Sequence, residues 1–129
     1  MNLKFDEAEY ARVRDWLLAA FAIAPAVFTE DEMIEKLRSN EWILLTTDNG
    51  AAVLQFFHDG EDWAANVIVV GGKIGGSLRE LMALQEQVCD ALRKMGFSYI
   101  QGEPRARWTR ILLKSGWQQH ERIFSKRLN

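Results

Sequence analysis

The sequence predicts a single α+β (α/β) domain over residues 1–129, with a mixed, mostly antiparallel central sheet flanked by helices in the order ααβββ-α-β-α-β. Three observations predict this class. Apolar residues near the N-terminus recur at helical spacing, and an Asn-Gly turn joins two strand-like runs further on. A glycine-rich segment then leads from an apolar run into a long amphipathic pattern. The chain length suits one hydrophobic core.

Two helices open the chain. Asp6 followed by Glu9 is a capping-box pattern, and the apolar residues after it predict a helix over 7–22. Thr29 with Glu32 is a second capping box, so we expect a second helix to begin there with one apolar face.

Three strand-like runs follow, at 42–47, 51–58 and 63–70. Asn49-Gly50 and Asp59-Gly60 separate them, and both dipeptides favour the positive φ angles of tight turns. The runs therefore predict an antiparallel meander. Within the third run, Val67–Val70 is apolar without alternation, which is typical of a strand buried on both faces and thus central in the sheet.

A glycine-rich segment, Gly71–Gly76, comes next and leads into Ser77, which forms a third capping-box pattern with Glu80. A long amphipathic helix then runs to Gly96, the expected residue just after a helix end. A short strand is expected at 97–101. Since a helix connects this strand to the previous one, the two should be parallel.

The last third holds one more helix and a final strand. Pro104 is expected near the first helical position, where its missing N–H costs nothing, and Gly116 closes the helix. The final strand lies within 117–128.

The net charge of −2 hides an asymmetry. Residues 1–90 hold 7 Lys/Arg and 16 Asp/Glu, whereas residues 91–129 hold 9 Lys/Arg and 2 Asp/Glu. A basic third on an acidic protein suggests a local site for a phosphorylated ligand. The alternative is that the two charge blocks face each other or solvent.

Several classes of protein are not expected. The one cysteine, Cys89, forms no intrachain disulfide, and His58 and His120 lie far apart, so we expect no metal. No apolar stretch has bilayer length and no secretory signal is visible, which predicts a cytoplasmic protein with no membrane partner. Five tryptophans could stack on bases, but the acidic chain lacks a repeating basic and aromatic pattern, so no nucleic acid is expected.

The glycine-rich segment is the clearest candidate in the sequence for binding an anion. Glycines let a backbone approach an anion, and the first turn of a helix adds unpaired N–H groups and the positive end of its dipole. A diphosphate suits such a loop. The segment matches neither the P-loop nor the GxGxxG pattern, so a plain glycine connection is an equal alternative from the loop alone.

The order of elements, together with Lys114-Ser115-Gly116-Trp117, resembles the GNAT (GCN5-related N-acetyltransferase) family. In that family a central strand is followed by a glycine loop and a long helix, and a later helix ends in a K-x-G-F/W pattern. The resemblance covers nearly the whole chain. It departs from the family at Gly71, where Gln or Arg is usual, and in its short closing strands.

The resemblance implies acetyl-CoA or another acyl-CoA as co-substrate and an amine as acceptor. The pantetheine arm would follow the exposed edge of Val67, Ile68, Val69 and Val70. The diphosphate would lie on Gly71, Gly72, Lys73, Ile74, Gly75, Gly76 and Ser77. The basic candidates for the phosphates, each of which can equally be surface charge, are Lys73, Arg79, Arg105 and Arg107.

The family's usual acid, a tyrosine, falls at Leu112, which cannot deliver a proton. The replacements are Tyr99 as acid, Glu61 as base and Ser115 as hydrogen-bond donor to the thiolate, with Asp62 and Glu103 as further bases. Packing is the alternative role for Tyr99.

Two functions follow. We favour an N-acyltransferase acting on a small amine or a protein amino group by direct attack on the thioester. The alternative is a GNAT-like module without catalysis, similar to short chains carried by bacteriophages. A homodimer is compatible with either.

Overall fold

The computed structural model describes residues 3–23 and 27–129, and of Ile23, Ala106 and Arg107 it describes the backbone alone. The helices in this part of the chain are α1 (Glu7–Ile23), α2 (Glu30–Arg38), α3 (Leu78–Lys94) and α4 (Ala106–Lys114). The strands are β1 (Trp42–Thr46), β2 (Gly50–Asp59), β3 (Asp62–Gly72), β4 (Tyr99–Gly102), β5 (Gln118–His120) and β6 (Ile123–Arg127).

The strands form one sheet in the order β1-β2-β3-β4-β6-β5. Neighbours are antiparallel except β3 and β4, which are parallel because α3 connects them. The predicted mixed, mostly antiparallel class is confirmed, as are the meander and the central position of β3. The closing segment differs from the prediction, because it forms a hairpin of two short strands, β5 and β6, rather than one strand.

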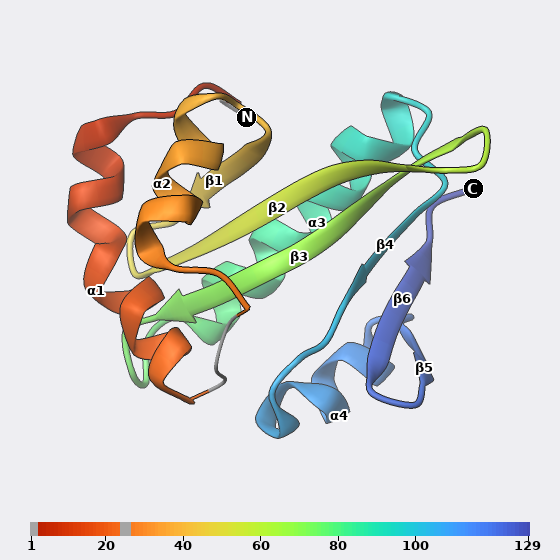
Figure 1. Cartoon of the computed structure of the whole chain (residues 1–129). Coiled ribbons are helices and arrows are strands. Elements are labelled where there is room, and N and C mark those ends of the chain that lie inside the picture. The colour runs from red at the N-terminus through yellow and green to blue at the C-terminus, as the bar shows by residue number, and fades with distance from the viewer. Residues whose placement is uncertain (1–2, 24–26) are drawn as a thin grey trace.

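Helices cover both faces of the sheet (Figure 1). On one face α1 and α2 pack against β1, β2 and β3 through a core that includes Val13, Leu17, Met33 and Val53. On the other face α3 and Trp108 of α4 pack through a second core that includes Leu92 and Phe124. The sheet is thus the middle of three layers.

The helix ends follow the sequence signals in part. The Thr29–Glu32 capping box is present, and Gly96 and Gly116 have positive φ angles of 88° and 90° just after α3 and α4. Asp6 accepts hydrogen bonds from the amides of Ala8 (2.9 Å) and Glu9 (3.2 Å), but the Glu9 carboxylate binds Arg12 and Thr46 instead of closing the box.

The start of α4 is shifted from the prediction. Arg105 is its N-cap, so Pro104 precedes the helix rather than opening it. The reason lies in β4, which continues to Gly102 and leaves Glu103 and Pro104 to make the turn into the helix.

No helix among residues 3–23 and 27–129 has the length and hydropathy needed to cross a membrane.

Candidate functional site

The two central strands separate along their length. β3 pairs with β4 at four positions, from Ala64 with Tyr99 to Val67 with Gly102, and then runs on to Gly72 without a β4 partner. Figure 1 shows the two strands diverging beyond this point.

A bulge and a proline explain the separation. Val53 of β2 pairs with Val69, and Leu54 pairs with Val67, so Ile68 is an extra residue in β3. A bulge bends a strand and increases its twist. On the other side Pro104 has no N–H to donate, so β4 cannot continue its ladder.

The separation opens a cleft of about 820 Å³. Val67–Val70 of β3 and Gly102–Arg105 lie along its two sides, so the predicted strand edge does line it. Arg105 reaches across and donates a hydrogen bond from Nη2 to the carbonyl oxygen of Val70 at 3.3 Å. Arg105 thus occupies one of the two acceptor positions of this carbonyl oxygen.

Two of the predicted loop glycines belong to β3 and serve packing. Gly71 and Gly72 pair with Ala51 and Gly50 of β2. A Cβ at Gly71 would lie 2.3 Å from the carbonyl oxygen of Trp16, and one at Gly72 would lie 2.5 Å from the Ser77 side chain. These two glycines are required for the close approach of α1 and of Ser77, which is a packing role beside the one expected at a diphosphate.

The loop itself covers residues 73–77, and the first amides of α3, directly after the loop, are unpaired. Lys73 donates its amide to the Asn49 carbonyl (2.7 Å), and Gly75 adopts a φ of 80°. The first amide of α3 with a backbone acceptor is that of Leu81, which bonds to the Ser77 carbonyl (2.9 Å). The amides of residues 78–80 precede it and find no acceptor among the described residues. An anion at this helix end would meet these donors and the helix dipole.

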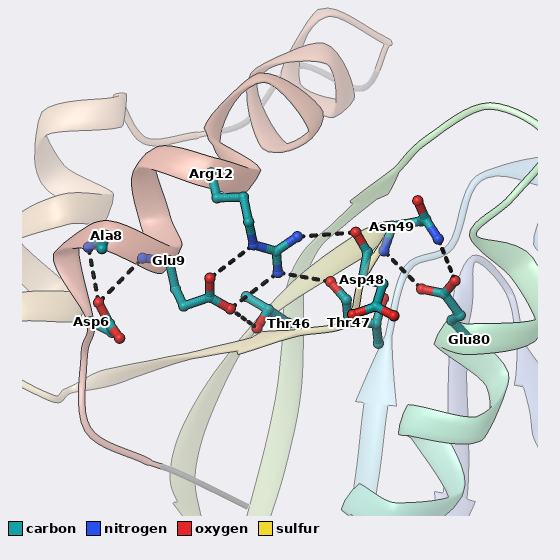
Figure 2. A network of polar contacts seen from close by, with 9 residues as sticks. All are labelled: Asp6, Ala8, Glu9, Arg12, Thr46, Thr47, Asp48, Asn49 and Glu80. Atoms are coloured by element: carbon teal, nitrogen blue, oxygen red, sulfur yellow. Dashed lines mark hydrogen bonds and ion pairs between the residues drawn. The ribbon is translucent and has the colours of Figure 1, made fainter.

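The predicted Ser77–Glu80 capping box is wrong. Ser77 is the N-cap of α3 but has helical backbone angles and makes no capping hydrogen bond from its side chain. Glu80 instead accepts from Asn49, at 2.8 Å from the amide and 2.5 Å from Nδ2 (Figure 2). The Asn49 side chain holds the pKa of Glu80 below its usual value. Asn49 thus contacts both ends of the loop, at Lys73 and at Glu80.

The β1–β2 turn is fixed in turn by α1 (Figure 2). Arg12 donates to the carbonyl oxygens of Thr47 (2.9 Å) and Asp48 (3.0 Å) and pairs with Glu9 at 2.8 Å. The hydrogen bonds from Arg12 and then from Thr46 lower the pKa of Glu9 to about 2. A continuous set of polar contacts therefore runs from α1 through the turn to the first turn of α3.

The three predicted catalytic residues are not brought together. Tyr99 lies at the far end of β4, and its hydroxyl donates to Asp59 at 2.7 Å. Burial, and then this hydrogen bond to Asp59, raise the pKa of Tyr99 to about 12. Glu61 lies in the exposed turn between β2 and β3, and the Ser115 hydroxyl donates to the Ile111 carbonyl (2.9 Å). None of the three lines the cleft.

The basic candidates are spread over the site. Lys73 and Arg79 are exposed near the start of α3, whereas Arg105 lines the cleft. The side chain of Arg107 lies outside the described part of the structure. Arg122, which the sequence did not single out for the site, lines the cleft and lies 3.5 Å from the Glu103 carboxylate.

Two further polar groups in the cleft wall were not predicted as site residues. Gln85 of α3 and Trp117 line the cleft, and the Gln85 Oε1 acceptor and the Trp117 Nε1 donor are buried without a hydrogen-bond partner in the described structure. Buried polar atoms are rarely left unpaired. A glutamine on the apolar face of the long helix was the available signal for Gln85. Among the described residues, no group of three His, Cys, Asp or Glu side chains could hold a metal ion.

Comparisons with known proteins give the fold and no closer relative. No family model matches the sequence, and no curated protein matches it. Among solved structures, N-acetylglutamate synthase from Neisseria gonorrhoeae, complexed with coenzyme A and N-acetyl-glutamate, superposes with a TM-score of 0.72 at 12% identity. That match covers 99% of this chain but 34% of the synthase, so the chain spans about a third of its length.

Two smaller proteins match along most of their length. An N-acyl amino acid synthase from uncultured soil microbes has a TM-score of 0.72 at 10% identity, covering 98% of this chain and 89% of the synthase. An acetyltransferase of the GNAT family from Staphylococcus aureus has a TM-score of 0.70 at 9% identity and covers 98% of both chains. The fold is therefore that of the GNAT acetyltransferases, as the sequence pattern predicts.

Proposed function

We propose that this chain, which has the GNAT acetyltransferase fold, binds an acyl-coenzyme A in the cleft and transfers the acyl group to an amine. The observation that carries the proposal is the separation of β3 from β4 next to the unpaired amides of α3. A ligand with an anionic end and an amide-bearing arm fits this pair of features. Coenzyme A has both.

The diphosphate is assigned to the start of α3. The amides of residues 78–80 and the dipole of a 17-residue helix favour negative charge there. Lys73 and Arg79 supply mobile positive charge, and Asn49 holds the loop in place through Lys73 and Glu80.

The pantetheine arm is assigned to the open edge of β3. The amides of the pantetheine arm offer both N–H donors and carbonyl acceptors. The cleft wall holds one unpaired donor, Trp117 Nε1, and one unpaired acceptor, Gln85 Oε1. The Val70 carbonyl becomes a further acceptor when Arg105 moves away. Pairing these atoms removes the cost of leaving them buried and unsatisfied.

The transfer itself needs few protein groups. An amine attacks the thioester carbonyl, a C–N bond forms, the C–S bond breaks, and the coenzyme leaves as a thiolate. Ile68 has no register partner on β2 or β4, and its amide is our candidate to polarise the carbonyl. Positioning of the two reactants then supplies much of the acceleration.

Proton transfer falls to the cleft rim. Glu103, half exposed beside Arg122, is the one carboxylate among the described residues that line the cleft, and it is our candidate to accept the amine proton. No tyrosine, cysteine or histidine lines the cleft in this part of the chain. We therefore assign no acid for the thiolate, which leaves unprotonated.

A second candidate is a module that binds acyl-CoA without turnover. The scattered positions of Tyr99, Glu61 and Ser115 and the apolar Leu112 favour it. Both candidates require coenzyme A to bind, and they differ only in transfer.

Thermal denaturation with increasing coenzyme A and acetyl-CoA tests binding. A ligand at 100 times its Kd should add about 2.7 kcal/mol to the free energy of unfolding. Release of free thiol in the presence of amines then separates the enzyme from the binding module. If neither ligand raises the melting temperature, both candidates are wrong.

A pair of variants localises the diphosphate. A side chain at Gly76 meets nothing closer than the Lys73 side chain at 4.0 Å, so Gly76→Asp and Gly76→Ala should both fold. Gly76→Asp places a negative charge beside the proposed diphosphate and should weaken coenzyme A binding about tenfold or more. Gly76→Ala should bind within about twofold of the parent chain. Equal binding of coenzyme A by both variants would show that the diphosphate does not bind at this loop.

A further inference from the structure

We infer that the acyl group this site takes is longer than acetyl, with a chain of up to about eight carbons. The inference rests on the proposed binding of acyl-CoA and specifies its substrate class. It follows from the size, the depth and the lining of the cleft.

Size is the first argument. The cleft holds about 820 Å³. If each heavy atom takes about the 30 Å³ that a water molecule occupies in the liquid, an acetyl group fills roughly 90 Å³. By the same measure the pantetheine arm fills roughly 540 Å³, which leaves about 280 Å³ for the acyl chain and the acceptor. An acetyl group would leave roughly 190 Å³ of this space to the acceptor, whereas a longer acyl chain fills it directly.

Depth is the second argument. The lining reaches from Phe124 of β6, past Ile100 of β4 and Val67 of β3, to Leu54 of β2 and Leu45 of β1. In the strand order of the sheet these residues span four interstrand spacings, or about 19 Å. The cleft therefore continues beneath the sheet, well beyond the gap between β3 and β4 where the thioester would lie.

Lining is the third argument. The charged side chains that line the cleft in the described structure, Glu103, Arg105 and Arg122, come from the segment after β4 and from the β5–β6 turn. The deeper wall between α3 and the sheet is formed by Leu81, Leu84, Val88, Ile100, Trp108 and Leu112. This wall favours an aliphatic occupant over a polar acceptor once the pantetheine arm pairs with Gln85 Oε1 and Trp117 Nε1.

The test is a series of ligands of increasing chain length. Isothermal titration with coenzyme A, acetyl-, butyryl-, hexanoyl- and octanoyl-CoA compares affinities on the unaltered chain. Each buried methylene can tighten binding by up to about fourfold. We expect octanoyl-CoA to bind at least about tenfold more tightly than acetyl-CoA.

A matched pair of variants on α4 tests where the acyl chain of the ligand lies. Leu112 is partly buried and lines the deep wall, whereas its neighbour Leu113 is 48% exposed and lies outside the cleft. Leu112→Trp should reduce the preference for octanoyl-CoA over acetyl-CoA to less than about threefold, and Leu113→Trp should leave it unchanged. Circular dichroism confirms that both variants fold.

The outcomes distinguish failure of coenzyme A binding from failure of the preference for a long acyl chain. If coenzyme A itself fails to bind, the proposed function is wrong. If coenzyme A and acetyl-CoA bind but octanoyl-CoA binds no more tightly, the proposed function stands and this inference is wrong. If Leu113→Trp lowers the preference as much as Leu112→Trp, the acyl chain does not lie in this cleft.

Discussion

The two edges of β3 differ in almost every respect. The edge facing β2 is paired along ten positions, from Gly50 with Gly72 to Asp59 with Asp62. The edge facing β4 is paired along four and then borders the cleft. One strand thus completes the N-terminal part of the sheet and also forms one side of the candidate site.

Polar contacts follow the same division. Ion pairs tie the two N-terminal helices together, with Arg14 at 2.7 Å from Glu30 and Arg38 at 2.6 Å from Glu7. Around the cleft the ion pair between Arg122 and Glu103 is longer, at 3.5 Å. The N-terminal part, α1 to β3, is therefore the more closely tied scaffold, and the part from β4 to β6 supplies the other wall of the cleft.

The largest expected contrast comes from one substitution made in both parts. Gly71→Ala drives a Cβ to 2.3 Å from the Trp16 carbonyl oxygen, a backbone atom of the scaffold, and should destabilise the fold by about 3 kcal/mol. Gly102→Ala brings a Cβ to 3.1 Å from the Val67 Cβ, where β4 can shift toward the cleft, and should cost less than about 1 kcal/mol. Urea denaturation measures both. Equal losses would show that the cleft wall is as rigid as the scaffold.

The second contrast asks whether the scaffold sets the affinity of the site. Asn49→Ala removes the side-chain bond to Glu80 and should weaken coenzyme A binding by about threefold to tenfold, because the loop and the start of α3 lose their support. Asp48→Ala is the control, since Arg12 binds the carbonyl oxygen of residue 48 and not its side chain. Titration calorimetry compares the two. Identical affinities would confine the role of Asn49 to folding.

The third contrast is the response to acid. Glu9 has a lower pKa in the folded chain, about 2, than its ordinary value of 4.5. Its contacts therefore stabilise the fold above about pH 4.5, and this contribution is lost as the pH falls toward 2. Glu9→Gln should flatten the fall of the melting temperature between pH 5 and about pH 2.5 relative to the unaltered chain. A parallel fall in the variant and the unaltered chain would contradict this role.

The smallest contrast lies within β3. Over Ile68–Gly72, amides that point away from β2 lack a ladder partner and should exchange with solvent at least about tenfold faster than the amides of β2. Hydrogen exchange read by NMR resolves them. Coenzyme A should slow exchange at these amides and leave β2 unchanged. No change on adding the ligand would place it elsewhere.

The sequence predicts the scaffold well because its signals are local. Helical spacing, the Thr29 cap and the Asn49-Gly50 turn each act within a few residues, and each is present in the structure. The Ser77–Glu80 box failed because Glu80 has a better partner, Asn49, 31 residues away. Tyr99 does not line the cleft, because it pairs with Ala64, four residues before the bulge at Ile68 in β3, and this register follows from no local pattern.

The cleft lining was the least predictable part. Gln85, Trp117 and Arg122 come from three separate segments and meet only through the packing of α3 and the β5–β6 hairpin against the sheet. The basic C-terminal third predicted a site for a phosphorylated ligand, and Arg105 and Arg122 from this third line the cleft, but the pattern did not identify Arg122.

The extra residue in β3 has a consequence for how the chain tolerates change. Ile68 and Val69 both pack toward the α1 and α2 face, after which alternation resumes with Val70 on the opposite face. Loss of the codon for Ile68 would leave the later residues of the strand on their present faces, because Val67 and Val69 already lie on opposite faces and pair with consecutive residues of β2. Such a deletion would remove the bend that the extra residue gives β3, together with the amide of Ile68, and should bring β3 and β4 closer together beyond Val67.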